Sequence, residues 1–160
     1  MSQFTIRSLT AADAPWVREF WIDHWGSDTM IAHGEVFHST GLSGFVADQA
    51  GQLVGLATYR LQGSECELLS LDAMVEGQGV GTLLLESVRA AARAAGCGRF
   101  FLITTNDNLN ALRFYQRRGF RLAALRPGAV DAARQIKPSI PLTGAYGIAI
   151  HDELELENVP

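Results

Sequence analysis

The sequence predicts a mixed α/β fold in a single domain over residues 1–160. Two patterns predict this fold class: short stretches in which apolar and polar residues alternate, as in half-buried strands, and longer stretches with the periodicity of amphipathic helices. A chain of 160 residues suits one hydrophobic core, and its 48% of apolar residues against 19% of charged residues is enough to build one. The predicted order of elements is β-α-α-β-β-β-α-β-α-β-β.

Strands are predicted where apolar and polar residues alternate, or where a short apolar run lies between turn residues. In chain order they cover residues 4–9, 44–48, 53–61, 65–73, 99–105, 120–125 and 152–157. The second and third should form a hairpin with Gly51 in its turn. The run 99–105 is almost continuously apolar, which is typical of a strand covered on both faces of its sheet.

Helices are predicted between these strands. The four helices of this order cover about 10–26, 29–38, 79–95 and 108–118, and residues 130–136 are a candidate for a further short helix. Thr10 is the expected cap of the first helix, which tolerates Pro15 in its first turn, while Gly96 and Gly119 should end the third and fourth. The segment 126–150 is otherwise irregular, and a loop of this length in a compact domain tends to be functional.

A glycine-rich turn reading E-G-Q-G-V-G lies at residues 76–81, between a predicted strand and a predicted helix. Alternate glycines let the backbone turn sharply, and the first turn of the helix then offers N–H groups and a positive dipole end to phosphate oxygens. A P-loop would need a lysine before Thr82, and a dinucleotide fingerprint would need a glycine in its place. At this point a phosphate-bearing ligand and a tight connection without any ligand both stay open.

A second polar segment follows at 105–120 and reads T-N-D-N-L-N-A-L-R-F-Y-Q-R-R-G-F. Asn108, Ala111 and Tyr115 are spaced i, i+3 and i+7, so they share one face of the predicted helix. The small side chain of Ala111 leaves room for a ligand along that face. A capping asparagine and an ordinary half-buried tyrosine are the alternative interpretation.

Together, the two segments resemble the GNAT superfamily of acetyl-CoA-dependent N-acetyltransferases, over roughly residues 44–125. The family has Gln/Arg-x-x-Gly-x-Gly/Ala at such a turn, which Gly79 and Gly81 match. Its later Asn-x-x-Ala-x-x-aromatic-Tyr helix with a following Gly-Phe is matched from Asn108 to Phe120. Glu76 departs from the pattern. We expect its carboxylate to point to solvent, because beside a pyrophosphate it would cost about 1 kcal/mol.

The resemblance implies a mostly antiparallel sheet of six to seven strands with helices on both faces. It also implies transfer of the acetyl group of acetyl-CoA to a primary amine of a small molecule or peptide, by direct attack in a ternary complex. Tyr115 would protonate the departing thiolate. The residues implied in cofactor binding are Leu71, Asp72, Ala73, Gly77, Gln78, Gly79, Val80, Gly81, Thr82, Asn108 and Tyr115.

An acceptor ammonium must lose a proton before it attacks, and the strand 65–73 carries three candidate bases. Glu65 and Glu67 should share one face of this strand, and Asp72 should lie on the other. Glu67, acting through water, is the favoured base, while carboxylates that are merely solvated remain the alternative. The resemblance also assigns acceptor specificity to the first helices and to 126–150, where we expect Arg134, Lys137 and their neighbours to fold over the acceptor.

Two other functions stay open. One is a CoA-binding sensor or pseudoenzyme without turnover, which the departure at Glu76 keeps open. The other is a phosphate-binding module unrelated to acyl transfer, for which the glycine turn alone would be sufficient.

Charge and composition limit the partners, the location and the metal sites that we expect of this protein. A net charge of −4 without a basic run argues against a nucleic-acid partner. No signal peptide and no run of about 18 apolar residues is visible, so we expect a cytoplasmic protein without a membrane partner. The histidines and cysteines have no metal-site spacing, and Cys66 and Cys97 should be free thiols. A homodimer through the final strand is left open.

Overall fold

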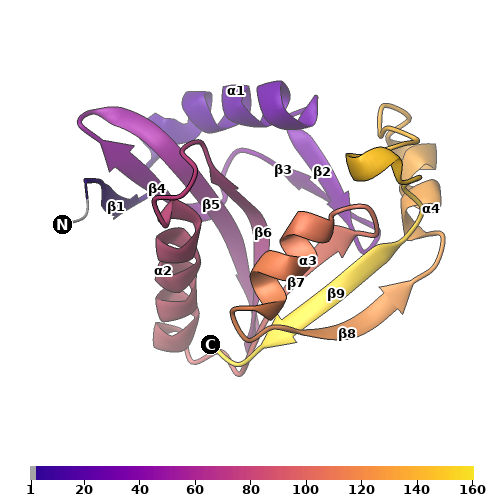
Figure 1. Cartoon of the computed structure of the whole chain (residues 1–160). Helices are drawn as coiled ribbons and strands as arrows, with labels where there is room; N and C mark the ends of the chain where they lie inside the picture. Colours follow the sequence, from indigo (N-terminus) through magenta and orange to yellow (C-terminus); the bar gives the residue numbers. More distant parts are fainter. Residues whose placement is uncertain (1–2) are drawn as a thin grey trace. The chain divides into compact units, whose positions relative to one another are not determined.

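The computed structural model describes residues 3–160 (Figure 1). Its strands are β1 (Thr5–Ser8), β2 (Thr29–Ala32), β3 (Glu35–His38), β4 (Ser43–Gln49), β5 (Gln52–Gln62), β6 (Glu65–Ala73), β7 (Arg99–Thr105), β8 (Arg121–Arg126) and β9 (Glu153–Asn158). Its helices are α1 (Ala14–Trp25), α2 (Val80–Ala94), α3 (Leu109–Gln116) and α4 (Ala129–Ile136), with short 3-10 turns η1 (Ala11–Asp13) and η2 (Ala145–Gly147).

Seven of these strands form one sheet in the order β1-β4-β5-β6-β7-β9-β8, and β2 and β3 form a separate pair. The predicted mixed α/β fold with a mostly antiparallel sheet of six to seven strands is therefore confirmed. Among the described residues, no helix is both long and apolar enough to span a membrane.

The chain falls into two compact units, which are described separately below. The first unit comprises Met1–Trp16, Thr40–Phe100 and Val159–Pro160, and the second comprises Val17–Ser39 and Phe101–Asn158. The expectation of one domain over the whole chain stays a prediction.

The first unit is an antiparallel sheet of β1, β4, β5 and β6 on which α2 packs. Gly55 of β5 shows how closely the helix approaches. A Cβ at this position would lie 2.6 Å from Val80 Cγ1 and 2.9 Å from Leu84 Cδ1. Leu84 and Val88 are fully buried, so the apolar face of α2 supplies the core of this unit.

Two local features of the first unit, the β4–β5 turn and the cap at Thr10, form as predicted. Ala50 and Gly51 form the two-residue turn between β4 and β5, and both have positive φ, 54° and 86°, as a tight hairpin turn requires. At the other end, Thr10 and Asp13 form a capping box, and Asp13 also accepts two hydrogen bonds of 2.8 Å from Arg7. These hydrogen bonds from Arg7 hold the pKa of the Asp13 carboxyl well below its ordinary value.

The second unit contains the one element whose type was predicted wrongly. Residues 29–38, expected as a short helix, form the antiparallel hairpin β2–β3. The reason is its turn: His33 and Gly34 both have positive φ, 42° and 79°, which a two-residue hairpin loop needs and a helix forbids. Both oxygens of the Glu153 carboxylate accept the His33 N–H, at 3.1 and 3.2 Å, so β9 holds this turn in place.

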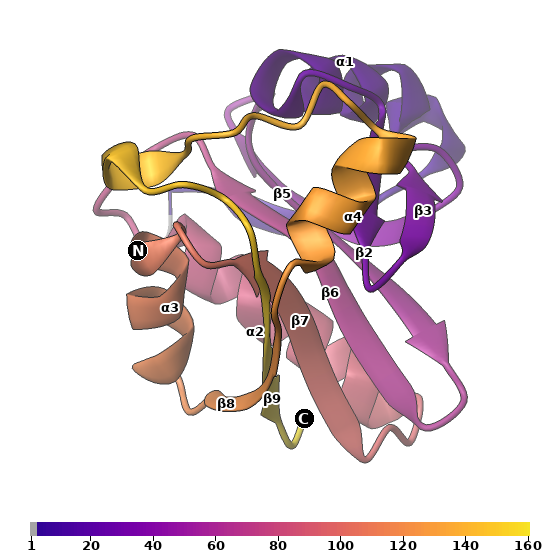
Figure 2. The ribbon, with the colours of Figure 1, turned by 90° about the vertical axis from the view of Figure 1, so that its right-hand side faces the viewer.

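The rest of the second unit consists of most of α1 and β7, the helices α3 and α4 and the antiparallel pair of β8 and β9. Its buried apolar side chains include Trp21, Leu102, Phe120, Val130 and Leu156. Figure 2 shows the long connection from α4 to β9, drawn in light orange to yellow, which carries η2. The helix predicted at 130–136 and the strand at 152–157 match α4 and β9 to within one residue.

Candidate functional site

The glycine turn has the backbone conformation that only glycine adopts without strain. Gly77 and Gly79 have φ of 71° and 75°, and Gly79 is the N-cap of α2. A Cβ on either residue would meet no other heavy atom of residues 3–160 within 4 Å. Gly77 and Gly79 are therefore required by the backbone conformation of the turn, as their sequence pattern suggested.

The first turn of α2 directs backbone N–H groups out of the helix. Its first helical hydrogen bond runs from the Leu83 N–H to the Gly79 carbonyl, so Val80 and Gly81 have no carbonyl of the helix to donate to. Gln78 is exposed beside them. Such a helix start, with its positive dipole end, suits phosphate oxygens. Glu76 is exposed, as predicted.

Strand β6, which leads into this turn, contains an irregularity that its sequence did not reveal. Thr58 of β5 pairs with Ser70 of β6, but the next residue of β5, Tyr59, pairs with Leu68. Leu69 is thus an extra residue, a β-bulge, and a bulge reverses the alternation of faces beyond it.

The bulge corrects the predicted placement of Asp72. Glu67 pairs with Arg60 and Asp72 with Leu56, and these two residues of β5 lie on one face because they are separated by an even number of positions. Glu65, Glu67 and Asp72 consequently share a face of β6. The prediction that Asp72 lies on the opposite face was wrong, because it assumed unbroken alternation.

This face of the sheet is polar although it is buried. Thr58 and Ser70 are 0% and 4% exposed, and their hydroxyl oxygens share a hydrogen bond of 2.6 Å. Glu67 is 2% exposed, and Arg60 Nη2 donates to its Oε1 at 3.2 Å. A buried row of hydroxyl and carboxylate groups on a sheet is unusual enough to suggest a function. Leu71 and Ala73 complete the end of the strand.

The Asn108 and Tyr115 positions lie on α3 in the second unit. Asn108 is the N-cap, and its Oδ1 accepts the Ala111 N–H at 3.2 Å. Tyr115 is buried at 8% exposure, and its ring makes edge contacts with Phe114 and Phe120, at centroid distances of 5.1 and 5.4 Å. Both residues thus have structural roles, which are compatible with the roles that the sequence predicts for them.

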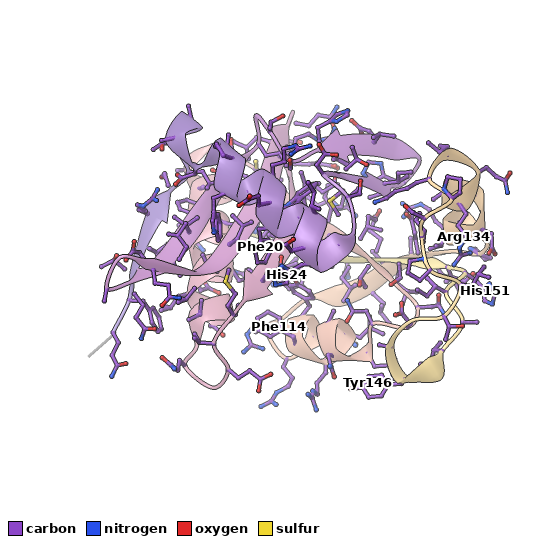
Figure 3. All side chains as sticks on the ribbon, turned by 90° about the horizontal axis from the view of Figure 1, so that it is seen from above. Phe20, His24, Phe114, Arg134, Tyr146 and His151 are labelled. Atoms are coloured by element: carbon purple, nitrogen blue, oxygen red, sulfur yellow. The ribbon has the colours of Figure 1, made fainter. Side chains whose placement is uncertain are left out.

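The aromatic residues of α1 and β3 divide into core and surface. Trp21 and Phe37 are buried, at 1% and 5% exposure, whereas Trp25 is 41% exposed. The Phe20 and His24 rings stack with centroids 3.9 Å apart, and Figure 3 shows both on α1. His24 and Trp25 are therefore the residues of this group that a ligand could reach.

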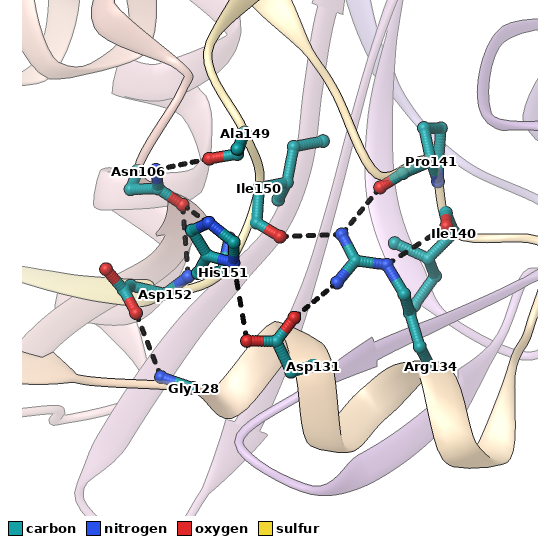
Figure 4. Close-up of polar contacts among 10 residues, drawn as sticks. All are labelled: Asn106, Gly128, Asp131, Arg134, Ile140, Pro141, Ala149, Ile150, His151 and Asp152. Carbon is teal, nitrogen blue, oxygen red and sulfur yellow. Dashed lines mark hydrogen bonds and ion pairs between the residues drawn. The ribbon is translucent and has the colours of Figure 1, made fainter.

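The uncharged segment 138–150, which we call the strap, is held by Arg134, one of the two cations of the segment expected to fold over the acceptor. Arg134 of α4 donates to the carbonyls of Ile140, Pro141 and Ile150 at 3.2, 2.6 and 2.6 Å (Figure 4). Lys137 Nζ donates to the Thr29 carbonyl at 2.7 Å, and burial lowers its pKa. Both side chains support the fold of the second unit.

Sequence reasoning missed Asn106 and Asp107. The Asn106 amide donates to the Ala149 carbonyl at 2.8 Å and accepts the N–H groups of His151 and Asp152 at 2.9 and 3.0 Å. Asp107 is 7% exposed and accepts the Ala145 N–H at 2.9 Å. Two polar residues between a strand and the N-cap of the following helix were the available signal.

The structure thus brings the candidate residues together in two groups, one in each unit. The end of β6 and the glycine turn form the first group, which contains Leu71 to Thr82. Asn108 and Tyr115 form the second group, on α3. Within residues 3–160, no cluster of three or more histidine, cysteine or acidic side chains is suited to a metal ion.

Comparison with known proteins identifies the family. Residues 10–120 match the model of the acetyltransferase (GNAT) family. The chain is 44% identical over 142 residues to the uncharacterized protein YdhI of Bacillus subtilis (strain 168), covering 88% of this chain and 89% of that protein. It is 33% identical over 127 residues to the streptothricin acetyltransferase of Streptomyces lavendulae, covering 76% of this chain and 65% of that protein.

The fold agrees with this match. A GNAT family acetyltransferase from Elizabethkingia anophelis, solved with acetyl-CoA bound, superposes with a TM-score of 0.69 at 18% identity and covers all of both chains. The family model spans more than half of the chain and includes both candidate groups. The chain therefore belongs to the acetyltransferase (GNAT) family.

Proposed function

We propose that this protein transfers the acetyl group of acetyl-CoA to a primary amine of a small molecule or peptide, by direct attack of the amine in a ternary complex. The observation that carries this proposal is the left-handed glycine turn at Gly77 and Gly79, which opens directly into α2. Membership of the acetyltransferase family supports acetyl-CoA as the donor, and a structural relative was solved with that molecule bound.

The donor groups present fit the pyrophosphate of CoA. The N–H groups of Val80 and Gly81 and the Gln78 amide would hold its oxygens, and the positive end of the α2 dipole would favour their charge. Thr82, Asn108 and the backbone from Leu71 to Ala73 are the further proposed contacts. Acetyl-CoA supplies an activated thioester, and a backbone N–H at the end of β6 would polarise the carbonyl of that thioester.

Tyr115 is the proposed proton donor to the departing thiolate. The variant Tyr115→Phe keeps the ring that packs against Phe114 and Phe120, so the fold should be preserved. Loss of a general acid should lower kcat by about a hundredfold. Turnover measured at saturating amine tests this role, and an unchanged kcat would remove Tyr115 from the chemistry.

Glu67 is the proposed base for the acceptor ammonium, acting through water. Asp72 is its matched control, because the bulge places both carboxylates on one face. The variants Glu67→Gln and Asp72→Asn should be compared by the pH dependence of kcat/KM. The general base is the carboxylate whose replacement removes the acidic limb of the profile of kcat/KM against pH. If only Asp72→Asn removes it, Asp72 is the base and Glu67 serves the Arg60 ion pair.

Thiol release from acetyl-CoA with a panel of primary amines tests the function as a whole. Streptothricin belongs in the panel because a relative is named for it. Release with one or more amines supports the enzyme. Tight CoA binding without release above background would instead indicate a non-catalytic CoA-binding protein, and tighter binding of a nucleotide than of CoA would indicate an unrelated phosphate site.

A further inference from the structure

Strand β8 is an edge of the sheet. Within residues 3–160 it stands at the end of the strand order and pairs with β9 alone, whereas β9 lies between β7 and β8. Figure 1 shows β8 running alongside β9. The outer side of an edge strand presents backbone N–H and C=O groups to which a strand of another chain can bind. A second chain can therefore extend this sheet at β8, while both edges of the final strand β9 are already paired.

The sequence of β8, R-L-A-A-L-R, reads the same in both directions. Two copies of such a strand, placed antiparallel about a two-fold axis through their centre, pair each residue with one of its own type. The alanines then meet at the centre. Leu122 of one copy lies opposite Leu125 of the other, and Arg121 lies opposite Arg126. The strand is therefore complementary to itself along its whole length.

A β-bulge brings the two leucines of β8 to one face of the sheet. Leu122 pairs with Leu156 of β9 and Leu125 pairs with Leu154, so a step of three residues on β8 matches a step of two on β9. Residues two apart on a strand share a face, and their partners Leu122 and Leu125 consequently do so as well. In a regular strand, a separation of three would place them on opposite faces.

This apolar row remains exposed at the edge. Leu122 is 54% exposed and Leu125 is 58% exposed. Soluble proteins usually protect an edge strand with lysine or proline, and β8 contains neither. When two copies pair, the four leucines lie side by side on one face of the joined sheet, and their contact removes apolar surface from water.

The arginines at the two ends of β8 do not oppose this pairing. Arg121 Nη2 donates to Glu157 Oε2 at 3.0 Å, and Arg126 Nη2 donates to Glu155 Oε1 at 2.6 Å. Each guanidinium therefore has a carboxylate of its own chain beside it. When Arg121 of one copy comes opposite Arg126 of the other, two negative charges accompany the two positive ones, and most of the like-charge repulsion is cancelled.

We propose that the outer edge of β8 binds β8 of a second copy of this chain, antiparallel, about a two-fold axis between Ala123 and Ala124. The contact involves the six residues of β8 from each copy and is small for a specific interface. The dimer is therefore weak, and its population rises with protein concentration. The inference is independent of the proposed function, because β8 contains none of the residues proposed for the site.

Sedimentation velocity of the full chain at increasing concentration should show a monomer that converts into a dimer. The variant Leu122→Lys/Leu125→Lys should stay monomeric, because positions 122 and 125 of the two copies then oppose like charges. The variant Leu122→Lys/Leu125→Glu loses the same two leucines but places opposite charges across the contact. It should dimerise at least about tenfold more tightly than the first variant, and salt should reduce this difference.

Leu142→Lys is the matched control, because Leu142 lies outside β8 and is 72% exposed. It should dimerise as the wild-type protein does. Circular dichroism should show that all the variants fold, since the replaced leucines are more than half exposed. A wild-type protein that stays monomeric at every concentration, or a dimer that persists unchanged in Leu122→Lys/Leu125→Lys, would overturn the inference. Equal self-association of the two double variants would also overturn it, because the antiparallel register requires them to differ.

Discussion

A methyl group added at Gly79 should destabilise the protein and weaken CoA binding at the same time. Gly79 has φ 75°, where an alanine costs about 1 kcal/mol through its Cβ alone. The new Cβ would meet no other described atom within 4 Å, so no packing term adds to this cost. If the backbone relaxes to avoid the strain, the N–H groups of the first turn of α2 shift. Losing one charge-assisted hydrogen bond would raise the Kd for CoA about tenfold.

Gly96 provides the matched control at the other end of α2. Its φ is 78°, and a Cβ there would also meet no heavy atom of the described chain within 4 Å. Gly79→Ala and Gly96→Ala should therefore lose the same stability, about 3 °C in Tm for a chain of this size. Calorimetric titration with CoA should then separate them. Equal CoA affinity in the two variants would refute the assignment of the phosphate seat to this turn.

Three further predictions concern single side chains. Asp13 has a depressed pKa through its hydrogen bonds with Arg7, so it stabilises the fold above its unfolded pKa of about 4, and this contribution is lost as the pH falls. Denaturant titration should show Asp13→Asn to be about 1 kcal/mol less stable at neutral pH, with the difference disappearing in acid. Burial raises the pKa of the Cys66 thiol to about 12, so iodoacetamide at mildly alkaline pH should label Cys97 and spare Cys66 until the protein unfolds. Arg134→Lys keeps the charge but loses the planar fork, so hydrogen exchange of the strap amides should accelerate about tenfold, and unchanged exchange would show that the clamp is dispensable.

Local patterns explain most of what could be predicted from the sequence. The β4–β5 hairpin follows from alternation and from Gly51, whose positive φ a tight turn requires. Helix α2 follows from its apolar face and from Gly96 just beyond its end. In each case the determining residues lie within one element or next to it, so the local sequence is sufficient.

The features that could not be predicted depend on partners far along the chain or on one extra residue in a strand. Residues 29–38 were assigned the wrong element because the turn at His33 carries no strong hairpin dipeptide, and Glu153, far along the chain, helps to hold it. The bulge at Leu69 lies within a mainly apolar run, and the residue types there do not indicate a bulge. The bonds from Arg134 to backbone carbonyls of the strap likewise join residues up to 16 positions apart, so the local sequence did not predict them.

The bulge at Leu69 means that the shared face of the β6 carboxylates depends on how the strand pairs with β5 as much as on residue identity. Deleting Leu69 would restore regular pairing with β5 and would leave every other side chain chemically unchanged. Ser70 and Asp72 would keep their present face, because they would then lie two and four positions from Glu67. A strand of unchanged length that paired regularly with β5 would instead place Asp72 on the face opposite Glu67. Homology transfer of a base to this strand is therefore secure only where the pairing with β5 is known as well as the residue type.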